Sequence, residues 1–199
     1  MSEATVDPQR RTWLITSAAV GGAGAVAAAV PFVGSFAPSE RAKAAGASVE
    51  VDISKLQPGE KIVVEWRGKP VWILRRTPEQ LATLEKVEDQ LADPNSERKV
   101  YPTPPYAKNR HRSIKPEYLV AVGICTHLGC SPVDKLQPGP QPSLPDDWQG
   151  GFLCPCHGTT FDLAGRVFKN KPAPDNLEIP PHRYLSDTVV LIGEDPPKA

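Results

Sequence analysis

The chain has 199 residues, in which 23 Lys and Arg balance 23 Asp and Glu, and we expect one compact domain with an appendage. A balanced charge lacks the basic excess typical of nucleic-acid-binding proteins, so we expect no nucleic-acid partner. The 23 prolines lie mostly after residue 90; they fix φ and remove backbone donors, which favours loops and strand edges in the second half.

An uncharged segment, residues 12–39, directly follows Arg10 and Arg11. Because about 20 apolar residues in a helix cross the hydrocarbon core of a bilayer, we expect a transmembrane helix over residues 12–36. The sequence Gln9-Arg-Arg-Thr-Trp-Leu is similar to a twin-arginine export signal, which serves proteins that fold before crossing. A cleaved secretory signal is the alternative to the retained anchor that we expect.

Positive residues stay on the cytoplasmic side of a membrane helix, which places residues 1–11 in the cytoplasm. We therefore predict a single-pass protein of the bacterial inner membrane whose C-terminal domain is periplasmic. Residues 37–48 are small and polar with little to bury, so we expect a flexible hinge linker between the anchor and a domain at residues 49–199.

The segment 49–199 has the pattern of a mostly antiparallel β domain with long loops. One short helix is expected over residues 78–87, where Thr77 can cap a helix whose first residue is a proline. His111 and His182 have no partner donors nearby in sequence, so we expect both at the surface. Short runs rich in Val, Ile and Leu predict strands at residues 48–53, 61–66, 70–75, 118–124, 152–153, 177–179 and 188–192.

All four cysteines and two of the four histidines fall within residues 125–157. They form two motifs, Cys125-Thr-His127-Leu-Gly-Cys130 and Cys154-Pro-Cys156-His157-Gly, and each follows an expected strand. Each motif can therefore be a loop tip that offers a cysteine and a histidine to one site. Three interpretations compete: a structural zinc site, two disulfides of an exported protein, or an iron–sulfur centre with two cysteine and two histidine ligands.

The two motifs resemble the cluster-binding boxes of the Rieske subunit of quinol–cytochrome c oxidoreductases, the cytochrome bc complexes. The resemblance continues through Thr159-Thr-Phe-Asp-Leu-Ala-Gly-Arg-Val and the Pro172-Ala-Pro174 segment. It implies a Rieske-type antiparallel β-sandwich domain with cluster-binding loops at 125–130 and 154–162, and one [2Fe–2S] cluster per chain. The implied cluster ligands are Cys125, His127, Cys154 and His157, with the cysteines on one iron and the histidines on the other, and the implied disulfide joins Cys130 and Cys156.

By the same resemblance, the chain is the electron-transfer subunit of a respiratory oxidoreductase. It accepts an electron from quinol at cytochrome b, with release of a proton, and passes it to the c-type cytochrome of the complex. The implied partners are these two cytochromes, quinol and membrane lipid, in a complex that we expect to be dimeric. His157 is the implied quinol-facing ligand, His127 the second histidine, and Leu128 the exposed apolar tip that docks on cytochrome b. Further residues expected around the cluster are Gly129, Pro155, Gly158, Thr159, Phe161, Pro172 and Pro174.

Two features depart from the family pattern. Many relatives have a serine and a tyrosine, which donate hydrogen bonds to cluster and ligand sulfurs, where this chain has Thr159 and Phe161. Phe161 has no hydroxyl to donate, so we expect a mid-range reduction potential that Phe161→Tyr raises. An insert at residues 131–150 lengthens the spacing between the motifs, and we expect it to be a surface loop outside the site. The alternative function is the small Rieske subunit of a periplasmic molybdenum oxidase such as arsenite oxidase.

Overall fold

The computed structural model describes residues 7–197. The chain divides into two compact units, residues 1–44 and 45–199, which are described separately below. The first unit contains the long helix, and the second contains the described strands. Residues 1–6 of the predicted cytoplasmic segment and residues 198–199 of the predicted domain lie outside the described residues.

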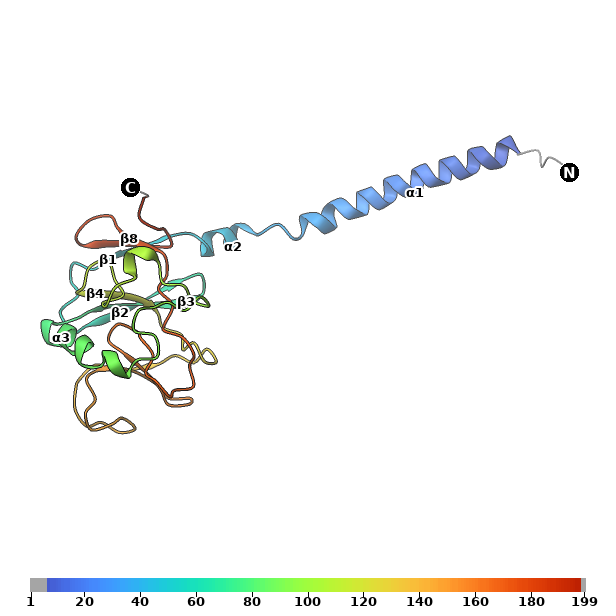
Figure 1. Ribbon diagram of the computed structural model, residues 1–199. Helices are drawn as coiled ribbons and strands as arrows, with labels where there is room; N and C mark the ends of the chain where they lie inside the picture. Colours follow the sequence, from blue (N-terminus) through green and yellow to red (C-terminus); the bar gives the residue numbers. More distant parts are fainter. Residues whose placement is uncertain (1–6, 198–199) are drawn as a thin grey trace. The chain divides into compact units, whose positions relative to one another are not determined.

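The first unit consists mainly of α1, a continuous helix of 27 residues from Pro8 to Gly34 (Figure 1). Asp7 caps it by accepting a backbone hydrogen bond through its side chain. The hydroxyls of Thr12 and Thr16 donate to carbonyl oxygens one turn earlier, so these polar groups are satisfied within the helix. At about 1.5 Å per residue α1 is about 40 Å long, and it is long and apolar enough to cross a membrane.

The helix begins and ends earlier than the predicted range 12–36, because a proline at the first helical position and an N-cap start it before the two arginines. Beyond it, the predicted linker 37–48 contains a short helix, α2 (Glu40–Ala45). Ser39 caps α2 through its side-chain oxygen, which accepts a hydrogen bond from a backbone N–H. The flexibility of the linker stays a prediction.

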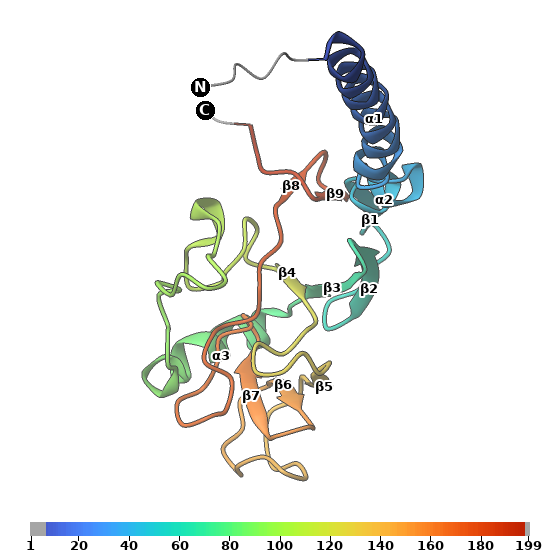
Figure 2. The same cartoon turned by 90° about the vertical axis from the view of Figure 1, so that its right-hand side faces the viewer.

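The described strands of the second unit form three antiparallel sheets of three strands each. Their strand orders are β1–β9–β8, β2–β3–β4 and β5–β6–β7. Figures 1 and 2 place the β2–β3–β4 sheet between the other two. The strands are β1 (Val49–Asp52), β2 (Lys61–Trp66), β3 (Lys69–Arg75), β4 (Tyr118–Val122), β5 (Val133–Lys135), β6 (Gly151–Cys154), β7 (Thr159–Asp162), β8 (His182–Tyr184) and β9 (Val189–Ile192).

The central strand β3 supplies side chains to two separate cores, because successive residues of a strand point to opposite faces. Val71 and Ile73 belong to the core that β1 and β9 share. Trp72 and Leu74 belong to the core that contains the buried cysteines. β3 therefore packs on one face against the β1–β9–β8 sheet and on the other face against the core beneath the cysteine loops.

One short helix, α3 (Pro78–Lys86), packs on the domain as predicted. Thr77 forms a capping box with Gln80: its hydroxyl accepts from the Gln80 backbone, and the Gln80 side chain accepts from the Thr77 backbone. Leu84 is fully buried and holds the helix against the cysteine core. Two short 3₁₀ turns, η1 (Glu88–Gln90) and η2 (Pro105–Ala107), complete the described helical elements.

Several strand predictions need correction. The predicted strand at residues 177–179 does not form; Leu177 instead donates its N–H to the carbonyl of Gly165, which joins two loops. The strands β5, β7 and β8 were not predicted, since each has only three or four residues and lacks a run of apolar side chains. The insert 131–150 is not only a surface loop: it contains β5, which pairs with β6, and the buried Trp148.

The prediction that His182 lies at the surface is wrong, because its side chain is fully buried. Its Nδ1 lies 2.9 Å from the carbonyl oxygen of Pro180, and its ring packs edge-on against Tyr106. Its buried Nε2 has no hydrogen-bond partner among the described residues. Burial lowers the pKa of His182, so the ring is neutral near neutral pH. His111 is half-buried, and its Nδ1 is buried, so it too is not a freely exposed residue.

Three arginines, Arg76, Arg112 and Arg166, are almost completely buried and hold the loops of this unit together. Arg76 and Arg112 each donate to three backbone carbonyl oxygens, and Arg166 pairs with the buried Asp162 at 2.8 Å. Burial lowers the pKa of Arg76 to about 9 and that of Arg112 to about 10, which leaves both charged at neutral pH. A guanidinium carries five donors in a fixed fork, so one side chain can satisfy several loop carbonyls.

We predict that His182 makes the folded chain less stable in mild acid. The unfolded state regains the ordinary pKa of 6.5, whereas burial holds the folded pKa below it. The unfolded state therefore binds more protons as the pH falls through that value, and acid favours unfolding. The unfolding temperature should fall between about pH 7.5 and about pH 5, and it should fall less for His182→Gln than for the unmodified chain. Equal decreases in the two proteins would contradict the prediction.

Candidate metal centre

The two predicted cluster-binding motifs fold into the same kind of tight loop. Gly129 N donates to the Cys125 carbonyl at 3.0 Å, and Gly158 N donates to the Cys154 carbonyl at 3.0 Å. Both glycines have a positive φ, 83° and 72°, which side chains disfavour, so glycine is the residue that closes each loop without strain. Each loop thus starts from a buried cysteine and carries a histidine before its closing glycine.

A disulfide between Cys130 and Cys156 joins the two loops. It spans a sequence separation of 26 residues, and closing a loop of this size contributes about 3 kcal/mol in the chain-entropy model. The Cys154 sulfur lies within 4.8 Å of both disulfide sulfurs. Those two sulfurs are bonded to each other and offer no thiolate, so these three cysteines are not a metal-ligand set.

The remaining cysteines, Cys125 and Cys154, are free thiols and both are buried. Burial raises the pKa of the Cys125 thiol, a hydrogen bond from the His127 backbone lowers it, and a hydrogen bond with the Cys154 thiol raises it. The two sulfurs are therefore neighbours beneath the loops. The presence of free thiols in the described structure argues against two disulfides.

The imidazoles of the two loops are in edge-to-face contact. The ring centroids of His127 and His157 are 4.8 Å apart, with the planes at 85°. His127 is half-buried and His157 is exposed. The two loops therefore carry two buried free thiols and two adjacent imidazoles, which are the donor types of a mixed-ligand [2Fe–2S] cluster, in which thiolates hold one iron and imidazoles the other.

A third loop, residues 170–176, packs beside the two motifs. The Thr126 hydroxyl donates to the Asp175 carbonyl at 2.6 Å, and Ala173 N donates to the Thr159 hydroxyl oxygen at 3.2 Å. The third loop is thereby bonded to both cluster-binding loops. The predicted Pro172 and Pro174, which flank Ala173, are exposed and stiffen this loop. Thr126 and Asp175 were not predicted, because nothing in their sequence pattern indicates a contact between them.

One tryptophan supports both loops from below. A Cβ added at Gly123 would lie 2.2 Å from the ring of Trp72, so only glycine fits there. The Trp72 ring also packs on Phe152, with the centroids 4.8 Å apart. Gly123 and Phe152 each precede a free cysteine by two residues. Sequence reasoning missed this support; the available signal was a glycine between an apolar strand and the first motif.

The other residues expected around the cluster divide between the surface and the core. Leu128 is 72% exposed, and Gly129, Pro155 and Gly158 are also exposed. Thr159 and Phe161 are fully buried. Burial raises the pKa of the Cys125 thiol, and the nearby Thr159 hydroxyl offsets part of that rise; donation from Thr159 to a sulfur stays a prediction.

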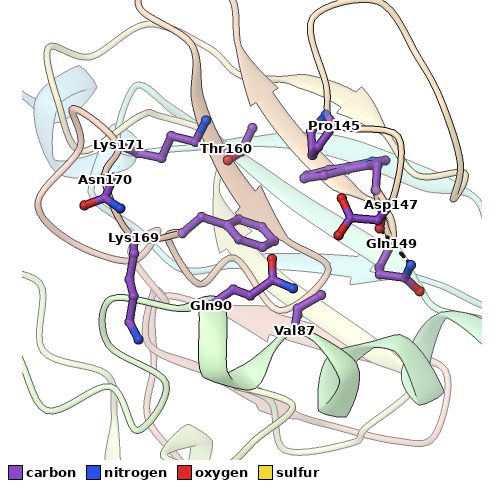
Figure 3. A pocket seen from close by; sticks show the side chains of 11 residues that line it. Val87, Gln90, Pro145, Asp147, Gln149, Thr160, Lys169, Asn170 and Lys171 are labelled. Carbon is purple, nitrogen blue, oxygen red and sulfur yellow. Dashed lines mark hydrogen bonds between the residues drawn. The ribbon is translucent and has the colours of Figure 1, made fainter.

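The insert 131–150 lines a hollow of about 350 Å³ that contains none of the predicted ligands. Figure 3 shows Val87 and Gln90 on one side of this hollow, Asp147 and Gln149 of the insert on another. The insert is fixed there because Trp148 packs on Phe168, with the ring centroids 5.6 Å apart. The insert therefore packs against the rest of the domain through Trp148, and it contains no predicted cluster ligand.

Comparison with known proteins decides the family. The ubiquinol–cytochrome c reductase iron–sulfur subunit of Allochromatium vinosum is 60% identical over 98% of this chain and 93% of that protein. The chain belongs to this family of Rieske iron–sulfur subunits. The family of the Rieske [2Fe-2S] domain matches residues 48–181, and the family described as the Fe-S subunit TAT signal of the same reductase matches residues 1–39.

A second curated relative supports the same assignment. The ubiquinol–cytochrome c reductase iron–sulfur subunit of Bradyrhizobium diazoefficiens is 39% identical over 94% of this chain and 95% of that protein. A chain of a solved structure titled "Hyperthermophilic respiratory Complex III" is 28% identical, with 88% of this chain and 97% of that chain covered and a TM-score of 0.47. The predicted family, the mostly antiparallel fold and the Rieske [2Fe–2S] domain are confirmed, whereas the assignment of individual ligands stays a prediction.

We predict that Phe161→Tyr raises the reduction potential of this Rieske subunit. Phe161 is fully buried in the same core as the two free cysteines, so a hydroxyl there would meet little water and would favour a sulfur acceptor. One neutral hydrogen bond is worth about 1 kcal/mol, which corresponds to several tens of millivolts for a one-electron couple. A redox titration of the complex measures the shift, and a variant that holds its cluster at an unchanged potential would contradict the prediction.

Proposed function

We propose that this Rieske subunit carries electrons from quinol, at cytochrome b, to the c-type cytochrome of a bc complex. The proposed [2Fe–2S] ligands are Cys125, Cys154, His127 and His157. The observation that carries the proposal is that two loops joined by one disulfide carry a buried free cysteine each and bring their histidine rings into edge-to-face contact. The names of its relatives favour this role over that of a molybdenum-oxidase subunit.

When bound, the cluster supplies a one-electron redox centre. Two neutral imidazoles in place of two thiolates make such a centre less negative, which places its potential at roughly −150 to +300 mV, a range suited to oxidising quinol. We assign Thr159 as a donor to the Cys125 sulfur, because its buried hydroxyl offsets part of the rise that burial causes in the pKa of that thiol. A sulfur that accepts a hydrogen bond bears extra negative charge more readily.

The histidines are proposed to handle the proton of quinol. An imidazole that binds iron through one nitrogen can hold or release a proton at the other. His157 is the more exposed of the two rings, so we assign it as the ligand that hydrogen-bonds quinol. Leu128 lies one residue beyond His127 and is exposed, which suits an apolar contact with cytochrome b that keeps water away from the transfer.

The proposed location follows from the first unit. α1 would be the single-pass anchor in the inner membrane, with Arg10 and Arg11 on the cytoplasmic side and in contact with lipid headgroups. The domain at 49–199 would then be periplasmic, and the linker 37–48 would serve as its hinge. The export-signal match over residues 1–39 supports this orientation. We further propose that the complex is dimeric.

The proposed ligands are tested by spectroscopy of the full chain in its membrane complex. After reduction with dithionite, the unmodified protein should give the EPR signal of a mixed-ligand [2Fe–2S] cluster. Cys125→Ser and His157→Gln should each abolish that signal, because each removes an iron ligand. His111→Gln is the matched control, since His111 lies outside the site, and it should keep the full signal. A colourless unmodified protein that contains zinc would overturn the proposal.

The docking role of Leu128 has its own test. We predict that Leu128→Asp leaves the EPR signal and the reduction potential almost unchanged, because the side chain is exposed and binds no iron. Quinol–cytochrome c reductase turnover of the complex should fall at least about tenfold, since a charge would have to be desolvated in an apolar contact. Turnover equal to that of the unmodified complex would contradict the docking role.

A further inference from the structure

Lys61, at the start of β2, lies against the aromatic pair that supports the cluster loops. Its ammonium nitrogen is 3.9 Å from the centroid of the Trp72 ring and 5.8 Å from that of Phe152. The Lys61 side chain is only 11% exposed, and its ammonium pairs with Asp134, whose side chain is 41% exposed. The cation is therefore more deeply buried than its counter-ion.

The same aromatic pair connects this cation to both free cysteines. Trp72 contacts Gly123, two residues before Cys125, and Phe152 lies two residues before Cys154 on β6. Along a strand, two residues span about 7 Å. The four side chains Trp72, Phe152, Cys125 and Cys154 belong to one buried core, so little water lies between the ammonium and the proposed ligands.

We propose that the charge of Lys61 helps to set the reduction potential of the cluster, and that Asp134 opposes it. Reduction adds one negative charge to the site, which a nearby cation stabilises and a nearby carboxylate destabilises. The interaction of Lys61 is weakly screened because the side chain is buried, whereas water screens Asp134 more. The net effect raises the potential. The inference rests on the proposed ligand set.

The test is a redox titration of the full chain in its membrane complex, in which the EPR signal of the reduced cluster is measured at each potential. Lys61→Gln should shift the potential downward, because the carboxylate of Asp134 is left without its cation. Asp134→Asn should shift it upward, because the ammonium is left without its counter-ion. Lys61→Arg keeps both the charge and the stacking on Trp72, so it should stay near the unmodified value.

Lys115 provides a matched control. It also stacks on an aromatic ring, 4.5 Å from the centroid of Tyr184, and it also pairs with a carboxylate, that of Asp187. Tyr184 packs against the other core, which contains neither free cysteine, and the Asp187 side chain is 98% exposed. Lys115→Gln should therefore leave the potential unchanged.

Opposite shifts in Lys61→Gln and Asp134→Asn, with Lys115→Gln unchanged, would support the inference. Shifts of the same sign would indicate distortion of the loops and overturn it, as would an unchanged potential in Lys61→Gln with a full EPR signal. If Lys61→Gln does not load its cluster, Asp134→Asn decides, and the absence of an upward shift overturns the inference. Failure of the proposed function is distinguishable, because the unmodified complex would then give no cluster signal.

Discussion

The candidate site depends on holding two short loops, from different parts of the chain, in one position relative to each other. The Cys130–Cys156 disulfide makes that connection at the loop tips, and Trp72 makes it at the base by contacting Gly123 and Phe152. The same two loops carry the free thiols and the adjacent imidazoles. A donor set assembled from loop ends would otherwise spread, since each loop contributes only one cysteine and one histidine.

The other loops of the domain are held in position by buried arginines. Long loops have few regular backbone hydrogen bonds, and their buried carbonyl groups need donors. Arg76 and Arg112 supply several donors each from fully buried positions. Two buried cations with only partial ionic compensation are costly to desolvate, so these arginines stabilise the arrangement mainly through the many carbonyl groups that they satisfy.

The features that were predicted from sequence are those with a local pattern. The helix capped by Thr77 was confirmed because both its cap and its apolar face lie within ten residues of chain. The family was confirmed because its two motifs are short and contiguous. In contrast, β7 was missed because its four residues, Thr-Thr-Phe-Asp, lack an apolar run, although its partner β6 is close in sequence. The burial of His182 was missed because it depends on Tyr106, which lies 76 residues away along the chain. The support by Trp72 was missed for the same reason, since only the fold brings β3 beneath the loops.

The disulfide has a consequence for the order of assembly. Disulfides form in oxidising compartments, whereas the twin-arginine route exports proteins that have already folded. On the proposed orientation, the two loops would therefore adopt their positions in the reducing cytoplasm with Cys130 and Cys156 still as thiols. The glycine-closed turns, the third loop and the base formed by Trp72 would have to position the donors by themselves at that stage. The disulfide would then lock, after export, a geometry that non-covalent contacts had already established.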